Sequence, residues 1–212
     1  MKDGLIAILR GITPQEVSAV GEVLVSSGFT AIEVPLTSPA AYESIVLLRD
    51  AYGDSVAIGG GTVLQPGQVQ ELRDLGTRLI VTPNMNPAVV EEARDLGMDS
   101  FIGCATPSEA LQAFELGATA IKIFPAQQVT PAIFRAWLDV LPRGSRYVPV
   151  GGIDAHGIRE WSGTEPSGYG IGGAIYRVGD SLSEVKQKAE EISAAFREVQ
   201  QHHEGKTNND VR

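Results

Sequence analysis

The sequence predicts a single-domain (β/α)8 barrel, the α/β fold in which eight parallel strands close into a TIM barrel. Two features support this prediction: short apolar runs alternate with helical patterns, and a polar residue followed by proline recurs where helices are expected to begin. An open doubly wound sheet is the alternative. Eight strand–helix units without insertions in 212 residues favour closure of the sheet.

Eight apolar runs are expected to form buried parallel strands, because strands that are covered on both faces carry few polar residues. In chain order the runs are Leu5–Leu9, Ala31–Leu36, Val56–Ile58, Leu79–Val81, Phe101–Ile102, Ala120–Phe124, Tyr147–Val150 and Tyr169–Ile171.

Six helices are expected to begin where a polar residue precedes proline, since this pair suits an N-cap and the first helical position. The pairs are Thr13-Pro14, Ser38-Pro39, Gln65-Pro66, Asn86-Pro87, Thr106-Pro107 and Thr130-Pro131. Each of these helices is expected to stop at a glycine that adopts a left-handed conformation. The glycines are Gly28, Gly53, Gly76, Gly97, Gly117 and Gly144. A weaker helix is expected near Asp154–Trp161, and a last helix from about Asp180 to Val199.

The barrel is expected to span residues 1–201. Residues 202–212 form a polar tail that we expect to be disordered, because it offers few apolar side chains to a core. The N-terminal residues lack the pattern of a signal peptide, and the chain has no apolar run of about 18 residues. These observations predict a cytoplasmic protein.

Composition argues against several kinds of partner and cofactor. A net charge of −9 disfavours nucleic acid and anionic membranes. No HExxH motif, cysteine pair or histidine cluster is present, and no dinucleotide fingerprint occurs, so neither a metal nor another cofactor is expected. The single cysteine, Cys104, has no histidine to activate it nearby in the sequence and is interpreted as a small buried hydrophobe.

Lys122 is the only lysine between Lys2 and Lys186, and it lies within the apolar run Ala120–Pro125. A buried ammonium is costly unless it is paired or deprotonated. One interpretation is a catalytic amine that attacks a carbonyl and forms a Schiff base. The other is a lysine that pairs with a structural carboxylate or extends its amine to solvent.

Strand alternation brings two further charged residues toward Lys122. If Lys122 points inward, Phe124 also points inward, and the same alternation turns Glu33 and Arg10 toward the interior. All three charged residues fall near the carboxyl ends of strands, where barrels of this type carry their chemistry. Three such groups on apolar strands favour a functional site over a structural ion-pair network.

Two glycine pairs follow the last two predicted strands. Gly151-Gly152 comes after the seventh strand and Gly172-Gly173 after the eighth. Loops at these positions often bind phosphate through backbone N–H groups, and glycine permits the close approach. Each pair alone is also ordinary turn chemistry, but the two together favour a phosphate site.

The run Gly59–Thr62 has two interpretations. It could form a tight strand-to-helix turn, or a loop that directs the Thr62 hydroxyl and backbone donors at a carboxylate.

Six motifs match one known family in order and spacing. They are Ile8-Leu9-Arg10-Gly11, Glu33-Val34-Pro35-Leu36, Gly59–Leu64, Ile80–Asn84, Lys122-Ile123-Phe124-Pro125 and Val150-Gly151-Gly152. Over roughly residues 4 to 200 the chain resembles the class I aldolases of 2-keto-3-deoxy-6-phospho sugar acids. The resemblance implies a homotrimer of barrels that reversibly cleaves a six-carbon phosphorylated acid into pyruvate and D-glyceraldehyde 3-phosphate without a cofactor.

The resemblance also implies residue roles. Lys122 would form the Schiff base, and Glu33 would be the general acid and base. The implied substrate-binding residues are Arg10, Gly61, Thr62, Pro83, Phe124, Val150, Gly151, Gly152, Gly172 and Gly173. Gly173 departs from the serine that is usual in the family, so weaker phosphate contact is expected at this position.

Two positions favour the galactonate branch of the family. The gluconate enzymes carry an arginine shortly after the catalytic glutamate and a threonine before the glycine pair, whereas here Glu33 precedes Val-Pro-Leu-Thr-Ser and Val150 precedes Gly151. The expected reaction is therefore cleavage of 2-dehydro-3-deoxy-6-phospho-D-galactonate, with the 6-phosphogluconate epimer or dual specificity as alternatives. More distant alternatives are a non-covalent phosphate-binding isomerase or synthase and a non-catalytic sugar-acid sensor.

Overall fold

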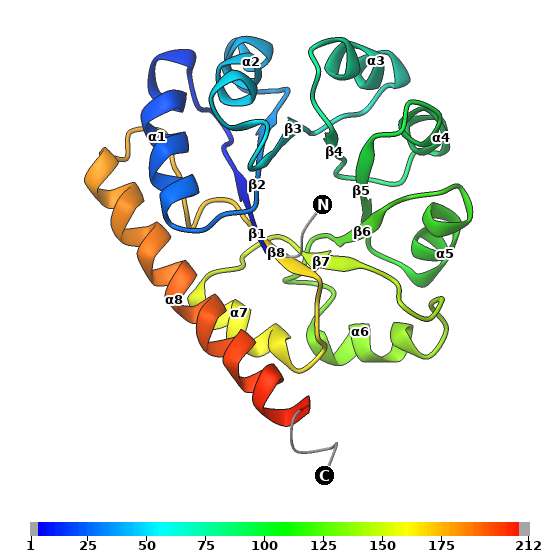
Figure 1. Ribbon diagram of the computed structural model, residues 1–212. Helices are drawn as coiled ribbons and strands as arrows, with labels where there is room; N and C mark the ends of the chain where they lie inside the picture. The colour runs from blue at the N-terminus through cyan, green and yellow to red at the C-terminus, as the bar shows by residue number, and fades with distance from the viewer. Residues whose placement is uncertain (1–3, 208–212) are drawn as a thin grey trace.

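Eight strands alternate with eight helices in residues 4–207, the part of the chain that the computed structural model describes (Figure 1). The strands are β1 (Gly4–Ile8), β2 (Ala31–Pro35), β3 (Ala57–Gly61), β4 (Leu79–Val81), β5 (Asp99–Cys104), β6 (Ala120–Ile123), β7 (Tyr147–Pro149) and β8 (Gly168–Ile171). The helices are α1 (Pro14–Ser26), α2 (Ala41–Tyr52), α3 (Pro66–Asp74), α4 (Pro87–Asp95), α5 (Pro107–Glu115), α6 (Pro131–Leu138), α7 (Ala155–Ser162) and α8 (Leu182–Thr207).

The strands form one parallel sheet that curls into a barrel. Their order is β7-β6-β5-β4-β3-β2-β1-β8. A parallel bridge between Val150 and Gly170 joins the two ends of this order, and the helices form a ring outside the strands (Figure 1). The predicted (β/α)8 barrel is therefore confirmed, and the open doubly wound sheet is excluded.

Apolar side chains form two layers, one on each face of the sheet. Ile32, Ile121 and Ile123 belong to the layer between strands and helices. Ile8 and Phe101 belong to the inner layer, which fills the barrel. The alternation expected for the strands is therefore present, and it turns Glu33 and Lys122 inward.

Five of the six proline pairs begin a helix as predicted, and Ser38-Pro39 does not. Helix α2 begins at Ala41, with Ala40 as its N-cap in a left-handed conformation (φ 45°). The Ser38 hydroxyl accepts a hydrogen bond from the N–H of Gly11 at 2.9 Å. Ser38 therefore joins two loops, and its side chain is not available to cap the helix.

Four of the six predicted glycine caps follow their helices in a left-handed conformation. These four are Gly28, Gly76, Gly97 and Gly117. Gly53 caps α2 with right-handed angles (φ −58°), so there the left-handed prediction is wrong. Gly144 is not a cap, because α6 already ends at Leu138. Its positive φ of 78° serves a later turn, in which the N–H of Ser145 donates to the carbonyl of Pro142.

Helix α8 is longer than predicted. It continues to Thr207, whereas the sequence predicted an end near Val199. Its inner face is anchored by Val185, Ala189 and Ile192, and polar composition does not prevent an anchored helix from continuing. Residues 208–212 of the predicted tail lie outside the described residues. Between residues 4 and 207, no helix is both long and apolar enough to cross a membrane.

Candidate active site

The carboxyl ends of the strands surround a cavity of about 400 Å³. Most of the predicted site residues line it, and they come from strands and loops that are far apart in the sequence. These residues are Arg10, Pro83, Lys122, Phe124, Val150, Gly151, Gly152, Gly172 and Gly173. Ile8, Ile153, Asp154, Ala174 and Arg177 also line the cavity and were not predicted from the sequence.

Lys122 extends from β6 into the base of this cavity and is 6% exposed. Its Nζ lies 4.7 Å from the centre of the Phe124 ring. Burial lowers the pKa of the Lys122 amine below its ordinary value; the charge of Glu33 opposes this change, and the charge of Arg10 adds to it. Lowering the pKa raises the fraction of free amine, which is the nucleophilic form.

Glu33 lies beside Lys122 at the inner face of the barrel. The two residues share a small adjoining cavity, and Glu33 is 1% exposed. Among the described residues its Oε2 has no hydrogen-bond partner. Burial raises the pKa of Glu33 to about 7, although the positive charges of Lys122 and Arg10 oppose this change. A carboxyl group with this pKa can both accept and donate a proton near neutral pH.

Gly61 provides the space that the Glu33 carboxyl occupies. A Cβ atom at Gly61 would lie 1.3 Å from Oε2 of Glu33, which is far inside contact distance. The run Gly59–Gly61 belongs to the strand β3 itself, so neither interpretation of this run was complete. The glycine is required by the close approach of a side chain, and Gly61 does not line the main cavity.

Arg10 is held at the rim of the cavity by two hydroxyl groups. Its Nη1 donates to Oγ1 of Thr37 at 3.1 Å, and its Nη2 donates to Oγ1 of Thr62 at 3.3 Å. Thr62 therefore acts on the cavity through Arg10 and does not line it directly. Thr37 was missed in the sequence, although its place just after β2 was a usable signal.

The glycine pairs after β7 and β8 lie on the same cavity. Gly151 and Gly152 have positive φ angles of 104° and 72°, which favour glycine. A Cβ atom at Gly152 would lie 2.6 Å from Nε2 of Gln127, so this loop packs closely on the loop after β6. Gly172 and Gly173 line the cavity from the loop after β8, so both glycine pairs border the same space.

Cys104 is buried and does not line the cavity. Burial raises the pKa of its thiol to about 12, so the reactive thiolate is disfavoured. The described residues contain no group of three or more histidine, cysteine or acidic side chains arranged to hold a metal ion.

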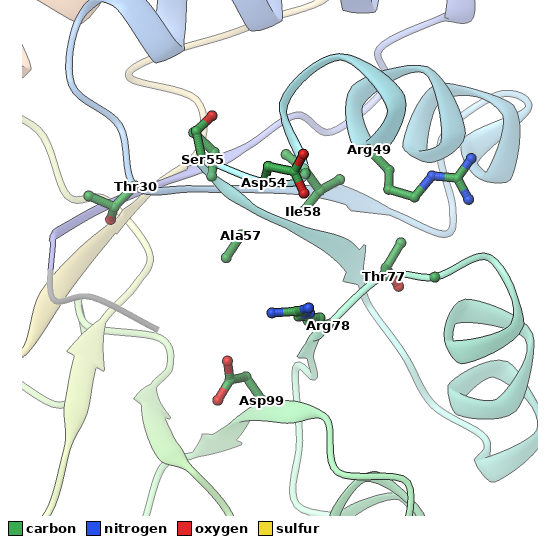
Figure 2. Close-up of a pocket in the computed structure, with 12 residues that line it drawn as sticks. Thr30, Arg49, Asp54, Ser55, Ala57, Ile58, Thr77, Arg78 and Asp99 are labelled. Carbon is green, nitrogen blue, oxygen red and sulfur yellow. The ribbon is translucent and has the colours of Figure 1, made fainter.

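A second cavity of about 400 Å³ lies where β3, β4 and β5 begin, at the end of the barrel opposite Lys122. Figure 2 shows Arg78 and Asp99 beside this hollow, with Arg49 farther out on α2. Arg49 donates to the carboxylate of Asp50. The two cavities are similar in size, so the buried amine and carboxyl at the other end distinguish the candidate active site.

Comparison with known proteins gives a family for this arrangement. The profile of the KDPG and KHG aldolases matches residues 1–193. The chain belongs to this aldolase family. Aldolases of the family are carbon–carbon lyases, so the protein is an enzyme, and the non-catalytic sensor considered from the sequence is excluded.

The aldolase is similar to two curated galactonate enzymes over nearly its whole length. It is 43% identical to the 2-dehydro-3-deoxy-6-phosphogalactonate aldolase of Escherichia coli K12, over 93% of this chain and 96% of that protein. It is 39% identical to the probable enzyme of the same name from Rhizobium meliloti, over 92% of each chain. A solved structure described as native KDPGal has a TM-score of 0.91 and 43% identity, over 93% of this chain and 96% of that one.

Proposed function

We propose that this aldolase cleaves 2-dehydro-3-deoxy-6-phospho-D-galactonate into pyruvate and D-glyceraldehyde 3-phosphate by class I chemistry. The observation that carries the proposal is the pair of Lys122 and Glu33, an amine and a carboxyl that are buried together beside one cavity. The similarity to the two galactonate enzymes supports the choice of substrate.

Lys122 is the proposed nucleophile. Its free amine attacks the C2 ketone and gives a carbinolamine, and loss of water then gives a protonated iminium. Burial lowers the pKa of Lys122 and so supports this step. Glu33 is the proposed proton donor for the departing hydroxyl, directly or through a water molecule.

Glu33 is also the proposed base for cleavage. It removes the proton from the C4 hydroxyl, so the C4–O bond becomes the aldehyde carbonyl and the C3–C4 bond breaks. The electron pair of that bond moves into the iminium and forms an enamine. After glyceraldehyde 3-phosphate leaves, Glu33 returns the proton to C3, and hydrolysis of the iminium frees pyruvate and the Lys122 amine. A pKa of about 7 suits a group that gives and takes a proton in one cycle.

The remaining predicted residues are proposed to position the substrate. Arg10, supported by Thr37 and Thr62, would bind the substrate carboxylate, since guanidinium donors match carboxylate oxygens. Pro83 and Phe124 would enclose the pyruvyl carbons. The glycine loops after β7 and β8 would bind the phosphate through backbone N–H groups.

The epimer preference rests on Val150 and on the named relatives. Val150 lines the cavity and has no hydroxyl with which to contact O4. This supports the galactonate epimer over the gluconate epimer or dual specificity. By the same family resemblance we propose a homotrimer that acts in the cytoplasm.

Borohydride trapping tests the covalent mechanism. The protein is incubated with pyruvate and reduced, and the modified peptide is mapped by mass spectrometry. A stable adduct on Lys122 is expected. Absence of an adduct, or an adduct on Lys186 or Lys188, would favour a non-covalent barrel enzyme. Cleavage rates with the two purified epimers then determine the substrate preference.

A further inference from the structure

The loop after β8 places an arginine beside the proposed phosphate site. Arg177 lines the cavity together with the two glycine pairs. Its Nε donates to the carbonyl of Gly173 at 2.9 Å. This hydrogen bond holds the planar guanidinium against the glycine loop, so the group has a defined position at the cavity.

The outer donors of Arg177 are available to a ligand. In the part of the chain described, neither Nη1 nor Nη2 of Arg177 makes a hydrogen bond. The acidic neighbour Asp180 accepts from the backbone N–H of Arg177 at 2.7 Å and from Nζ of Lys188 at 2.6 Å. Its carboxylate therefore bonds to the backbone of Arg177 and to a lysine, and not to the guanidinium.

Asp180 does not line the cavity, and Asp154 is the acidic residue that does. Its Oδ1 accepts from the N–H of Gly157 at 2.8 Å and caps α7. Arg10 is held toward the loops after β2 and β3 by its two threonine contacts. Arg177 is thus the cation that belongs to the loop after β8, where the phosphate is proposed to bind.

We propose that Arg177 binds the phosphate group of the substrate and makes the enzyme select phosphorylated over unphosphorylated sugar acids. The proposal rests on the proposed function. Guanidinium N–H groups match phosphate oxygens in a bidentate arrangement, and such charge-assisted hydrogen bonds are strong. Arg177 also lies beside Gly173, where the resembling family usually carries serine. Its donors therefore compensate for the missing hydroxyl.

Replacement of the guanidinium tests this assignment. In Arg177→Gln, we expect the ratio of kcat/KM for phosphorylated to unphosphorylated 2-dehydro-3-deoxygalactonate to fall about 10- to 100-fold. Arg177→Lys keeps a positive charge but loses the paired N–H donors of the guanidinium, so the ratio should fall by less than in Arg177→Gln. The matched control is Arg197→Gln on α8, an exposed arginine away from the cavity, which should keep the wild-type ratio.

A serine at position 173 provides a second, independent test. A Cβ atom at Gly173 would lie 3.7 Å from Nε of Arg177, which is ordinary contact, so serine fits without strain. We expect Gly173→Ser to restore part of the lost ratio when it is added to Arg177→Gln. Recovery of the kcat/KM ratio would require both variants to be folded. No recovery would follow if Arg177 only stabilised the loop.

Binding of inorganic phosphate separates failure of this inference from failure of the proposed function. Calorimetric titration of the intact protein should show phosphate binding that weakens about tenfold or more in Arg177→Gln. Equal phosphate affinity in both proteins, or an unchanged substrate ratio, would overturn the role of Arg177. A third outcome is that the wild-type protein cleaves neither epimer, yet Arg177→Gln binds phosphate more weakly than the wild type. In that case the proposed substrate is wrong and the phosphate site is retained.

Discussion

At the scale of single residues, burial is what makes Lys122 and Glu33 reactive. An exposed lysine and glutamate would both be charged at neutral pH and would attract one another as ions. Burial raises the pKa of Glu33 and lowers that of Lys122, so it favours the neutral form of each group. Their mutual attraction opposes this shift. The amine can therefore act as a nucleophile beside a carboxyl that exchanges protons.

The pKa of Glu33 predicts a pH dependence for cleavage. Glu33 must hold a proton to release water from the carbinolamine before it can act as the base at C4, so its ionisation should lower kcat/KM as the pH increases through about 7. Glu33→Gln should lower kcat/KM about 10²- to 10⁴-fold and remove this fall. The measurement is a pH profile of both proteins. If the variant keeps the same fall, the titrating group is another one.

Gly61 predicts a defect that depends on space alone. Gly61→Ala would force its new methyl group against the Glu33 carboxyl, because a Cβ atom in that position would lie only 1.3 Å from Oε2. We expect about 1–3 kcal/mol lower stability and at least a tenfold loss of kcat. Chemical denaturation and steady-state kinetics measure the two effects.

Gly67→Ala in α3 is the matched control for Gly61→Ala. Apart from its chain neighbours and the backbone of its own helix, nothing lies within 4 Å of the position of its new Cβ, and alanine favours the helix by about 0.5–1 kcal/mol. Equal stability and activity in the two alanine variants would show that the space beside Glu33 does not require glycine.

At the scale of the elements, hydrogen bonds link neighbouring loops at the carboxyl ends of the strands. Ser38 follows β2 and binds the N–H of Gly11, which follows β1. Arg10 lies next to Gly11 and bonds to the threonines that follow β2 and β3. Three neighbouring strand–helix loops are therefore linked, and the position of Arg10 depends on all of them.

Ser38→Ala should weaken this link. The substitution removes the partner of the part-buried N–H of Gly11, which costs about 0.5–1.5 kcal/mol. We also expect a higher KM, because Arg10 would be less well positioned. The matched control is Ser44→Ala in α2, where the buried hydroxyl has no partner among the described residues, so its loss should be nearly neutral. Equal effects of the two variants on stability and KM would contradict the proposed link.

At the scale of the whole molecule, the active site reduces stability under the conditions in which it works. Unfolded glutamate has an ordinary pKa of 4.5, whereas folded Glu33 has a pKa of about 7. The native state therefore holds its proton over this range while the unfolded state releases it. The favourable contribution of protonated Glu33 is present below pH 4.5 and is lost as the pH rises through about 7.

Glu33→Gln should remove most of the loss of stability that the protein shows as the pH rises through the pKa of Glu33. The difference between the two pKa values corresponds to roughly 3 kcal/mol of unfolding free energy between acidic and mildly alkaline pH. Urea denaturation of wild-type and variant protein at pH 5 and pH 8 measures the effect. The advantage of the variant should grow with pH; an advantage that is constant would show that Glu33 does not titrate between these values.

The sequence alone determined the barrel, the order of its elements and the inner face of the strands that position Arg10, Glu33 and Lys122. Alternation along Ala120–Phe124 and Ala31–Leu36 was enough to turn Lys122 and Glu33 inward, because side chains on a strand follow a period of two. Local hydrogen-bonding chemistry also located five of the six proline-marked helix starts. These properties are encoded over short distances along the chain, so periodicity and capping patterns predict them.

Only the tertiary structure decided which groups meet around the cavity. Thr37 supports Arg10, Gly61 makes room for Glu33, and Arg177 contacts the glycine loop after β8. The partners in each contact are far apart along the chain or lie in an irregular loop, so no local pattern links them. Ser38 was assigned to a helix cap because a cap is a local interaction, whereas its actual partner is in another loop. Such contacts depend on how loops from different strands converge, and no local pattern in the sequence carries that information.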